Sequence, residues 1–393
     1  MKKKIFILFS FSLLYCDESI LSSLKQKEFD IDYKKSEVES KKLRDSWINP
    51  INMSYIKTKN DQYGLNSETK SFKISIDQPI FKSGGIYFAI KYADANKEFS
   101  KLSIKEREKE LIAKALDLLY KYYKTKLMIE KQKLLIENAK IDVLRKKEQY
   151  LSGFLDSSFL DQAILNKNQQ ELKLLELQDS LNEIYKNFKN ISDKEPDNIK
   201  LPHFTIINKD EYLEKNIAIK KYKEDEKVKK YFKNMTIARY LPSFSLTASY
   251  NEIENKAALF MPSGKESYKE YGFKITMPLF DINSFRNIES TKLDFLKSKI
   301  LKIDNKREEL NRYEITLKKI KILDKKINLA KEDIKLYSSL LQDTKSRYEA
   351  GEKTIYDVDT LKNSLDNRKI DIKIYEIEKQ ENLLEIYKRV VNG

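Results

Sequence analysis

Residues 71–81 read SFKISIDQPIF, and residues 272–280 read GFKITMPLF. In both stretches apolar side chains alternate with polar ones up to a proline, which is the period-two pattern of a half-buried β-strand. The two prolines, Pro79 and Pro278, stand 199 positions apart. The chain therefore contains the same kind of strand-forming segment twice.

A second pair of landmarks follows the prolines at nearly the same distance. Residues 150–153 read YLSG and residues 348–351 read YEAG, and each tyrosine comes 71 or 70 positions after its proline. Self-similarity at a fixed period indicates a duplicated structural unit. We predict an internal two-fold repeat, with a first unit at 17–190, a polar linker at 191–208 and a second unit at 209–393.

Each unit is predicted to contain two strands, at about 47–57, 71–80, 241–252 and 271–280. One face of these segments is small or charged, as a water-filled lumen requires. Aromatic residues gather at the strand ends, as they do at the interfaces of a bilayer, namely Trp47, Tyr55, Phe81, Tyr250, Tyr271 and Phe280. Four strands cannot close a barrel alone, so several chains would have to share one. A half-buried sheet of a soluble protein is the alternative.

Long helices are predicted between the strands, because apolar residues recur at helical spacing without Pro or Gly from about 86 to 150 and from about 285 to 347. Roughly 60 residues of helix make a rod of roughly 90 Å, which needs partners along its whole length. After each rod a short glycine-containing turn leads into another helical segment. We therefore predict two helical hairpins, at about 86–190 and about 285–391.

The hairpin tips are predicted at 150–154 and 348–353. Glycine suits such a turn because it accepts a positive φ without a Cβ clash. The residues that mark the two turns are Tyr150, Gly153, Tyr348 and Gly351.

Residues 1–16 are predicted to be a signal peptide, since three lysines precede an apolar run from Ile5 to Tyr15. The run is too short to span a bilayer as a helix. Cys16 follows Leu-Leu-Tyr, which resembles a bacterial lipobox except for the tyrosine in place of a small residue. Lipidation of Cys16 and ordinary cleavage both remain open.

The composition argues against several other classes of protein. The 76 Lys and Arg exceed the 61 Asp and Glu, giving a net charge of +15, but these charges are spread along the chain, as on a solvated helix face. A nucleic-acid-binding rod is therefore the weaker interpretation, and we expect no nucleic-acid partner. One cysteine and one histidine cannot build a zinc site. No catalytic constellation or phosphate-binding loop appears, so we expect neither an enzyme nor a cofactor.

Three motifs in the second unit are more specific than the periodicity. They are ARYLPSFSLTA at 238–248, MPLFD at 277–281 and RYEAGEKTIYDV at 347–358. With their weaker counterparts in the first unit, they make nearly all of the mature chain resemble the TolC-type outer-membrane efflux proteins, or outer membrane factors. The chain departs from the family pattern in two places: Asp281 replaces a glycine pair, and Phe159 stands where relatives often carry Asp.

This resemblance implies an α+β membrane protein that forms a homotrimer. Its twelve strands would make one transmembrane β-barrel in outer-membrane lipid, continued by a coiled-coil barrel of long helices in the periplasm. The implied function is the passive exit duct of a tripartite efflux or type I secretion system, for drugs, toxic compounds or proteins. Its partners would be a periplasmic adaptor and an RND-type or ABC-type inner-membrane transporter. A periplasmic coiled-coil scaffold that opens no pore is the alternative.

Charged residues near the tips are the candidates for a periplasmic gate. Asp161 and Asp359 lie eight residues after their glycines, and Asp357 lies six after Gly351. In a trimer each becomes a three-fold ring, which can attract cations or close a pore when paired with a base. The candidate partners are Lys353, Arg347 and Tyr348. The alternative is that Asp357 only favours the helix N-terminus and that the other two acids are solvated.

Overall fold

The computed structural model describes residues 20–62, 65–256 and 264–391, so the predicted signal peptide and Cys16 lie outside the described part. The chain divides into two compact units. Unit 1 comprises residues 1–30, 105–217 and 307–393, and unit 2 comprises residues 31–104 and 218–306. These units do not coincide with the two sequence repeats, because each combines segments of both.

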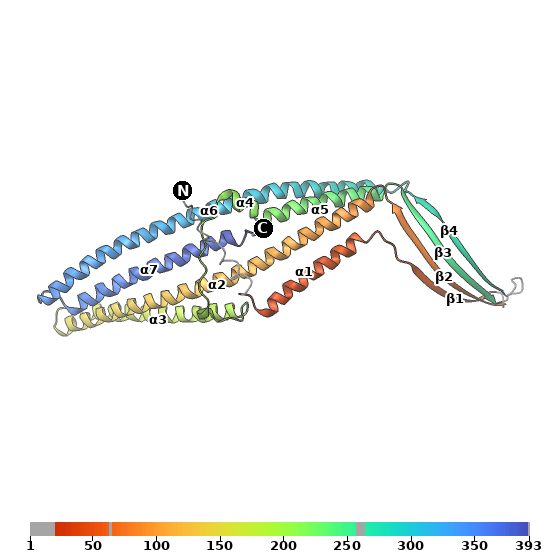
Figure 1. Ribbon diagram of the computed structural model, residues 1–393. Helices are drawn as coiled ribbons and strands as arrows, with labels where there is room; N and C mark the ends of the chain where they lie inside the picture. Colours follow the sequence, from red (N-terminus) through yellow and green to blue (C-terminus); the bar gives the residue numbers. More distant parts are fainter. Residues whose placement is uncertain (1–19, 63–64, 257–263, 392–393) are drawn as a thin grey trace, which may run out of the picture. The chain divides into compact units, whose positions relative to one another are not determined.

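Unit 2 contains a four-stranded antiparallel sheet in the order β1-β2-β3-β4 (Figure 1). The strands are β1 (Asn52–Gln62), β2 (Leu65–Phe81), β3 (Ser243–Lys256) and β4 (Gly264–Thr276). The prediction of four strands in the chain is confirmed for the described residues. Pairing of β2 with β3 joins the two sequence repeats edge to edge, with Glu68 opposite Lys256.

The strands differ from the predicted segments mainly at their ends. β2 begins earlier than predicted, and Trp47 lies in a turn before β1. β4 also begins earlier, but it ends at Thr276 rather than at Phe280. Pro278 explains this end, because a proline has no N–H to give to a strand ladder and is excluded from strand interiors.

The two faces of the sheet carry different side chains. Strand register places most of the apolar side chains of the four strands on one face, and these are Met53, Tyr55, Phe72, Ile74, Ile76, Phe244, Leu246, Ala248, Tyr250, Tyr271, Phe273 and Ile275. Many are open to solvent in the single chain, and Tyr271 is 89 % exposed. The opposite face is mostly Ser, Thr and Asn. A large exposed apolar face of this kind marks a surface that interacts with a membrane or with another protein.

Four helices enter or leave unit 2: α1 (Ser23–Arg44), α2 (Gly85–Leu151), α5 (Ile217–Arg239) and α6 (Ile282–Glu349). Gly84 has φ +83°, and a Cβ on Gly85 would lie 3.3 Å from the Ala238 Cβ. Glycines therefore let the start of α2 approach the end of α5. At the corresponding junction before α6, the Asp281 side chain instead accepts a hydrogen bond of 2.9 Å from the Asn283 N–H.

Unit 1 holds the remaining helices and the segment that joins the two repeats. The helices are α3 (Ser157–Lys189), the 3-10 turn η1 (Pro196–Asn198), α4 (Lys209–Lys215) and α7 (Ile355–Tyr387). The joining segment is anchored, since the Tyr123 hydroxyl donates to the Pro196 carbonyl at 3.1 Å and the Tyr120 hydroxyl to that of Pro202. No helix in the described part of the chain is long and apolar enough to cross a bilayer.

A compact core in unit 1 fixes α4 against α6 and α7. Its buried members are Ile207, Tyr212, Tyr313, Ile386 and Val390. The rings of Tyr212 and Tyr313 stack with centroids 5.0 Å apart, and the Tyr313 hydroxyl donates to the Ile207 carbonyl at 2.7 Å.

Replacing Ile386 by Ala is expected to lower the free energy of unfolding by about 2–4 kcal/mol, because it leaves a cavity in this core. Ile386 is 1 % exposed, whereas Leu24 on α1 is 76 % exposed. Leu24→Ala is the control and should change the free energy of unfolding by no more than about 0.5 kcal/mol. Urea unfolding in detergent measures both, and equal losses would contradict the assigned core.

Candidate functional site

The two hairpin tips in unit 1 adopt the same backbone turn. Gly153 and Gly351 have φ of +75° and +77°, the left-handed conformation that glycine tolerates. In each turn the glycine N–H donates to the carbonyl of the tyrosine three positions earlier, Tyr150 or Tyr348, at 3.0 Å. The repeated YxxG sequence therefore encodes a repeated helix end.

The helices that follow the tips are capped differently. Before α3, the Asp156 side chain accepts a hydrogen bond of 2.9 Å from the Ser158 N–H. Before α7, Thr354 and Asp357 form a capping box, in which the Thr354 N–H donates to the Asp357 carboxylate at 3.1 Å. Only the second tip thus uses a carboxylate at the third helical position.

Asp357 also links the two hairpins. Its second carboxylate oxygen accepts from Arg145 Nη2 on α2 at 3.1 Å. The hydrogen bond from the Thr354 backbone, its hydroxyl and the charge of Arg145 hold the pKa of Asp357 below its usual range. The carboxylate is therefore ionised at neutral pH and satisfied by groups from both hairpins.

The predicted partners of Asp357 are not the ones that the single chain supplies. Arg347 pairs with Asp343 one turn earlier on α6, at 3.0 Å. Lys353 is exposed and contributes only its charge to the lowered pKa of Asp357. Arg145 was missed because it lies 212 positions away on the other repeat. The repeat offset of 198 does contain a signal, since it aligns Arg145 with Asp343 and so places opposite charges at equivalent positions.

The other candidates lie near the tips without making contacts of their own. Asp161 is exposed and Asp359 is half-buried, and neither carboxylate forms a hydrogen bond or ion pair within the described part of the chain. Tyr348 is 43 % exposed, and its hydroxyl has no hydrogen-bond partner among the described residues. The single chain therefore assembles Asp357 with Arg145, but it does not join the other two acids to a base.

The Arg145 contact is one of five polar contacts between α2 and α7, and the one closest to the tip is the hydrogen bond of 2.9 Å from the Tyr356 hydroxyl to the Glu148 carboxylate. The α2 members of the other four are spaced seven residues apart, which is the repeat of an antiparallel coiled-coil seam. The pairs are Lys124 with Glu381 at 2.8 Å, Lys131 with Asp371 at 2.5 Å, Asn138 with Asn363 at 2.8 Å, and Arg145 with Asp357 at 3.1 Å. We refer to these four pairs as the α2–α7 ladder.

Burial of the ladder decreases toward the tips. The side chain of Asp371 is 6 % exposed, whereas those of Arg145 and Asp357 are 37 % and 31 % exposed. Burial raises the pKa of Glu381, the ladder acid farthest from the tips, while its partner Lys124 lowers it. A partly exposed pair is worth only about 0.2–1 kcal/mol. The Arg145–Asp357 pair is therefore the pair of the ladder whose separation costs the least free energy.

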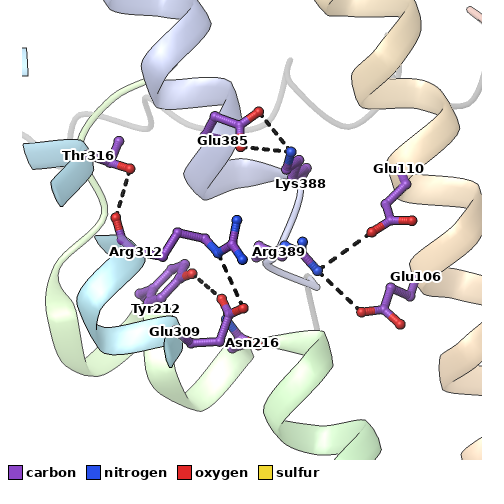
Figure 2. Close-up of polar contacts among 10 residues, drawn as sticks. All are labelled: Glu106, Glu110, Tyr212, Asn216, Glu309, Arg312, Thr316, Glu385, Lys388 and Arg389. Carbon is purple, nitrogen blue, oxygen red and sulfur yellow. Dashed lines mark hydrogen bonds and ion pairs between the residues drawn. The ribbon is translucent and has the colours of Figure 1, made fainter. Parts of the chain in front are cut away.

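A second polar cluster lies elsewhere in unit 1 (Figure 2). The Glu309 carboxylate is 2 % exposed and accepts hydrogen bonds from the Tyr212 hydroxyl at 2.6 Å and from Asn216 Nδ2 at 2.9 Å. Burial, followed by the hydrogen bond to Glu309, raises the pKa of Tyr212. Nearby, Arg389 contacts the carboxylate of Glu106 at 3.3 Å.

This cluster fastens the end of α7 to the start of the second repeat. The Ile217 N–H donates to the Arg389 carbonyl at 2.8 Å, and the Val391 N–H donates to that of Lys215 at 2.9 Å. The acids of this cluster already accept hydrogen bonds from Tyr, Asn and Arg side chains. The cluster therefore holds the two segments together rather than supplying a reactive group. Within the described residues, no group of three or more His, Cys, Asp or Glu could hold a metal ion.

Asp357→Asn is expected to lower the free energy of unfolding by about 1 kcal/mol at pH 7, because it weakens a helix cap and an ion pair. Since the folded-state pKa is lowered, this contribution is present above the unfolded pKa of about 4 and is lost as the pH falls through the folded value. The difference between wild type and variant should therefore shrink toward pH 3 in urea titrations. Asp161→Asn is the control, and a pH-independent difference would contradict the assignment.

Comparison with known proteins finds no matching family model and no matching curated sequence. Solved structures do match over most of the chain. The outer membrane protein VceC of Vibrio cholerae gives a TM-score of 0.73 at 14 % identity and covers 93 % of both chains. The Campylobacter jejuni CmeC outer membrane channel gives 0.74 at 16 % identity and covers 95 % of this chain and 84 % of that one.

The open state of the Neisseria gonorrhoeae MtrE outer membrane channel gives a TM-score of 0.73 at 12 % identity, over 96 % of this chain and 87 % of that one. At such identities the likeness shows a shared fold. The predicted resemblance to the TolC-type outer-membrane efflux proteins is thus confirmed at the level of the fold.

Proposed function

We propose that this protein is a passive outer-membrane channel, the exit duct of a tripartite efflux or type I secretion system. Three copies would form a twelve-stranded transmembrane β-barrel continued by a coiled-coil barrel in the periplasm. The chain itself performs no chemistry, and energy comes from an inner-membrane pump of the RND or ABC type. The fold that the chain shares with outer membrane channels supports this proposal.

The sheet of unit 2 is the observation that carries the proposal. One face is apolar and exposed, and the other is polar, as lipid on one side and water on the other require. In the described chain β1 and β4 each pair on one side only, which leaves two open edges. Backbone groups within a bilayer must be paired, so β4 of one copy would pair with β1 of the next until the sheet closes.

Open coiled-coil stripes on the helices of unit 1 support the same assembly. On α6, Ile315, Ile322, Leu329 and Leu336 recur every seven residues and are 53–62 % exposed. On α3, Leu165 and Leu172 show the same spacing and are 62 % and 58 % exposed. A heptad stripe is the sequence pattern of a helix seam. In a homotrimer, α3 and α6 of adjacent copies would cover these stripes.

The closed state is proposed to depend on the tips. Three copies of the Arg145–Asp357 pair would hold the second hairpin of each chain against its first. Asp161 and Asp359 would form acidic rings near the opening, and Lys353, Arg347 and Tyr348 of a neighbouring copy would be their partners. A periplasmic adaptor that engages the tips would open the pore by separating the least buried rung of the α2–α7 ladder.

Planar bilayers distinguish this channel from a periplasmic scaffold that opens no pore. The purified trimer should give discrete conductance steps, whereas a scaffold gives none. Replacing Asp357, Asp359 and Lys353 by Ala should raise the single-channel conductance and the leakage of antibiotics into cells, because the acid and base contacts at the tips are lost. Asp366→Ala, which removes a half-buried acid that pairs with Lys369 farther along the same helix, is the control. Conductance equal to that of the wild type in the triple variant would refute the proposed gate.

Adaptor docking is tested by cysteines at the two tips. Ser152→Cys and Ala350→Cys should each form cross-links to a periplasmic adaptor in cells treated with a thiol-reactive cross-linker. Lys27→Cys, on α1 and away from the tips, should form none. If both tip variants fail to capture an adaptor while the trimer still conducts, the adaptor part of the proposal is wrong and the channel part stands.

A further inference from the structure

The apolar face of the sheet changes to a charged face toward the two hairpin loops. We propose that this charged band binds the phosphate headgroups of anionic phospholipids, in the leaflet farther from the helix ends of the strands. We refer to its lysines as the lysine rim, and they are Lys57, Lys59, Lys70, Lys256, Lys265 and Lys269. The proposal rests on the proposed membrane channel, because only a spanning sheet places this band at a headgroup layer.

The change from apolar to charged occurs on all four strands, and it comes one same-face position closer to the helix ends on β3 and two positions closer on β4 than on β1 and β2. On β1, Tyr55 is followed on the same face by Lys57 and Lys59, and on β4, Tyr271 is preceded by Lys269. On β2 the last apolar residue of this face is Phe72, next to Lys70. Successive residues on one face lie about 7 Å apart, so the charges begin directly beyond the apolar band. A boundary of this kind coincides with the edge of the hydrocarbon layer.

Positive charge is in excess on this band. The six lysines face four carboxylates, which are Asp61, Glu68, Glu252 and Glu254. Glu68, Glu252 and Glu254 each accept one lysine within about 3 Å; the pairs are Lys57 with Glu68 at 3.1 Å, Lys70 with Glu254 at 3.1 Å and Lys265 with Glu252 at 2.7 Å. Lys256 and Lys269 make no such short pair and are exposed. Their ammonium groups are available to an anion.

The opposite face of the same strands does not share this excess. Its charged residues are Lys73, Lys274, Asp77, Glu266 and Glu270, so acids outnumber lysines there. Lys274 is held by Asp77. Positive charge is therefore concentrated on the side of the sheet that also carries the apolar band. This segregation favours a ligand that is itself apolar at one end and anionic at the other.

An anionic phospholipid has that chemistry. Its acyl chains would cover the apolar band, and its phosphate would accept hydrogen bonds from lysine ammonium groups. Lysine suits a fluid headgroup layer, because its long stem lies along apolar surface while the charge reaches the phosphate. Free phosphate carries the negative charge of the lipid headgroup but has no acyl chains. The apolar band would therefore contribute nothing to its binding.

The experiment compares the lipids retained by detergent-solubilised trimers. Native mass spectrometry counts phosphatidylglycerol and phosphatidylcholine bound after incubation with an equal mixture. The rim variant is K57Q/K59Q/K265Q/K269Q, and the matched control is K27Q/K34Q/K35Q/K42Q on α1, which removes the same number of charges. A milder variant, K256Q/K269Q, leaves every short ion pair in place. Inorganic phosphate is added as a competitor in a further arm.

Wild type and the control should prefer phosphatidylglycerol, and the rim variant should lose at least about fivefold of that preference. The milder variant should show an intermediate loss, which keeps the test valid if the rim variant does not assemble. Equal binding of both lipids by the wild-type trimer, unchanged preference in both rim variants, or displacement by millimolar phosphate overturns the proposal. The same spectra report the trimer mass, so an absent trimer identifies failure of the proposed assembly instead.

Discussion

An open strand edge cannot remain open inside a bilayer, and in the proposed channel this constraint decides how the chains assemble. The sheet of unit 2 has an exposed apolar face and edges at β1 and β4. Every N–H and C=O on those edges would be left without a partner in hydrocarbon, at a cost of several kcal/mol each. A single chain cannot satisfy this requirement, because four strands are too few to close on themselves. In the proposed channel, oligomerisation would therefore follow from backbone hydrogen bonding rather than from any particular side chain.

The two repeats use one backbone plan with different side chains. Both tips turn on a glycine in the left-handed conformation, since no other residue adopts it as cheaply. The caps that follow differ, with Asp156 acting alone and Thr354 acting with Asp357. The equivalent positions Arg145 and Asp343 also carry opposite charges. Arg145 pairs with Asp357 of the other hairpin, whereas Asp343 pairs with Arg347 on its own helix.

The α2–α7 ladder contains a buried pair, Lys131 with Asp371, and a partly exposed pair, Arg145 with Asp357. Burial makes the first pair harder to break than the second. Asp371 is almost fully buried and receives Lys131 and Arg368, so breaking that rung would leave a charge in a poorly hydrated site. Asp357 is partly exposed, so water can replace Arg145 at little cost. Farther along unit 1, Glu309 is fastened by Tyr212 and Asn216. In the proposed gate, the same helix pair would therefore open at its tips while its remaining contacts persist.

The sequence alone was sufficient to predict the four strands, the long helices and the two glycine turns. These depend on local rules: side-chain alternation, helical periodicity and the positive φ of Gly153 and Gly351. The strand ends were predicted less well. β4 stops before Pro278, and the ends of the other strands depend on how each strand pairs with the neighbouring strands. The partner of Asp357 could not be read from local sequence, since Arg145 reaches it only through the antiparallel packing of α2 on α7. Likewise, Glu309 is one acid among 61 Asp and Glu residues until the fold buries it beside Tyr212. Local sequence thus determined the helices, strands and turns of this protein. Only tertiary packing decided which charged residues pair, because pairing depends on burial and on the register between segments far apart in the chain.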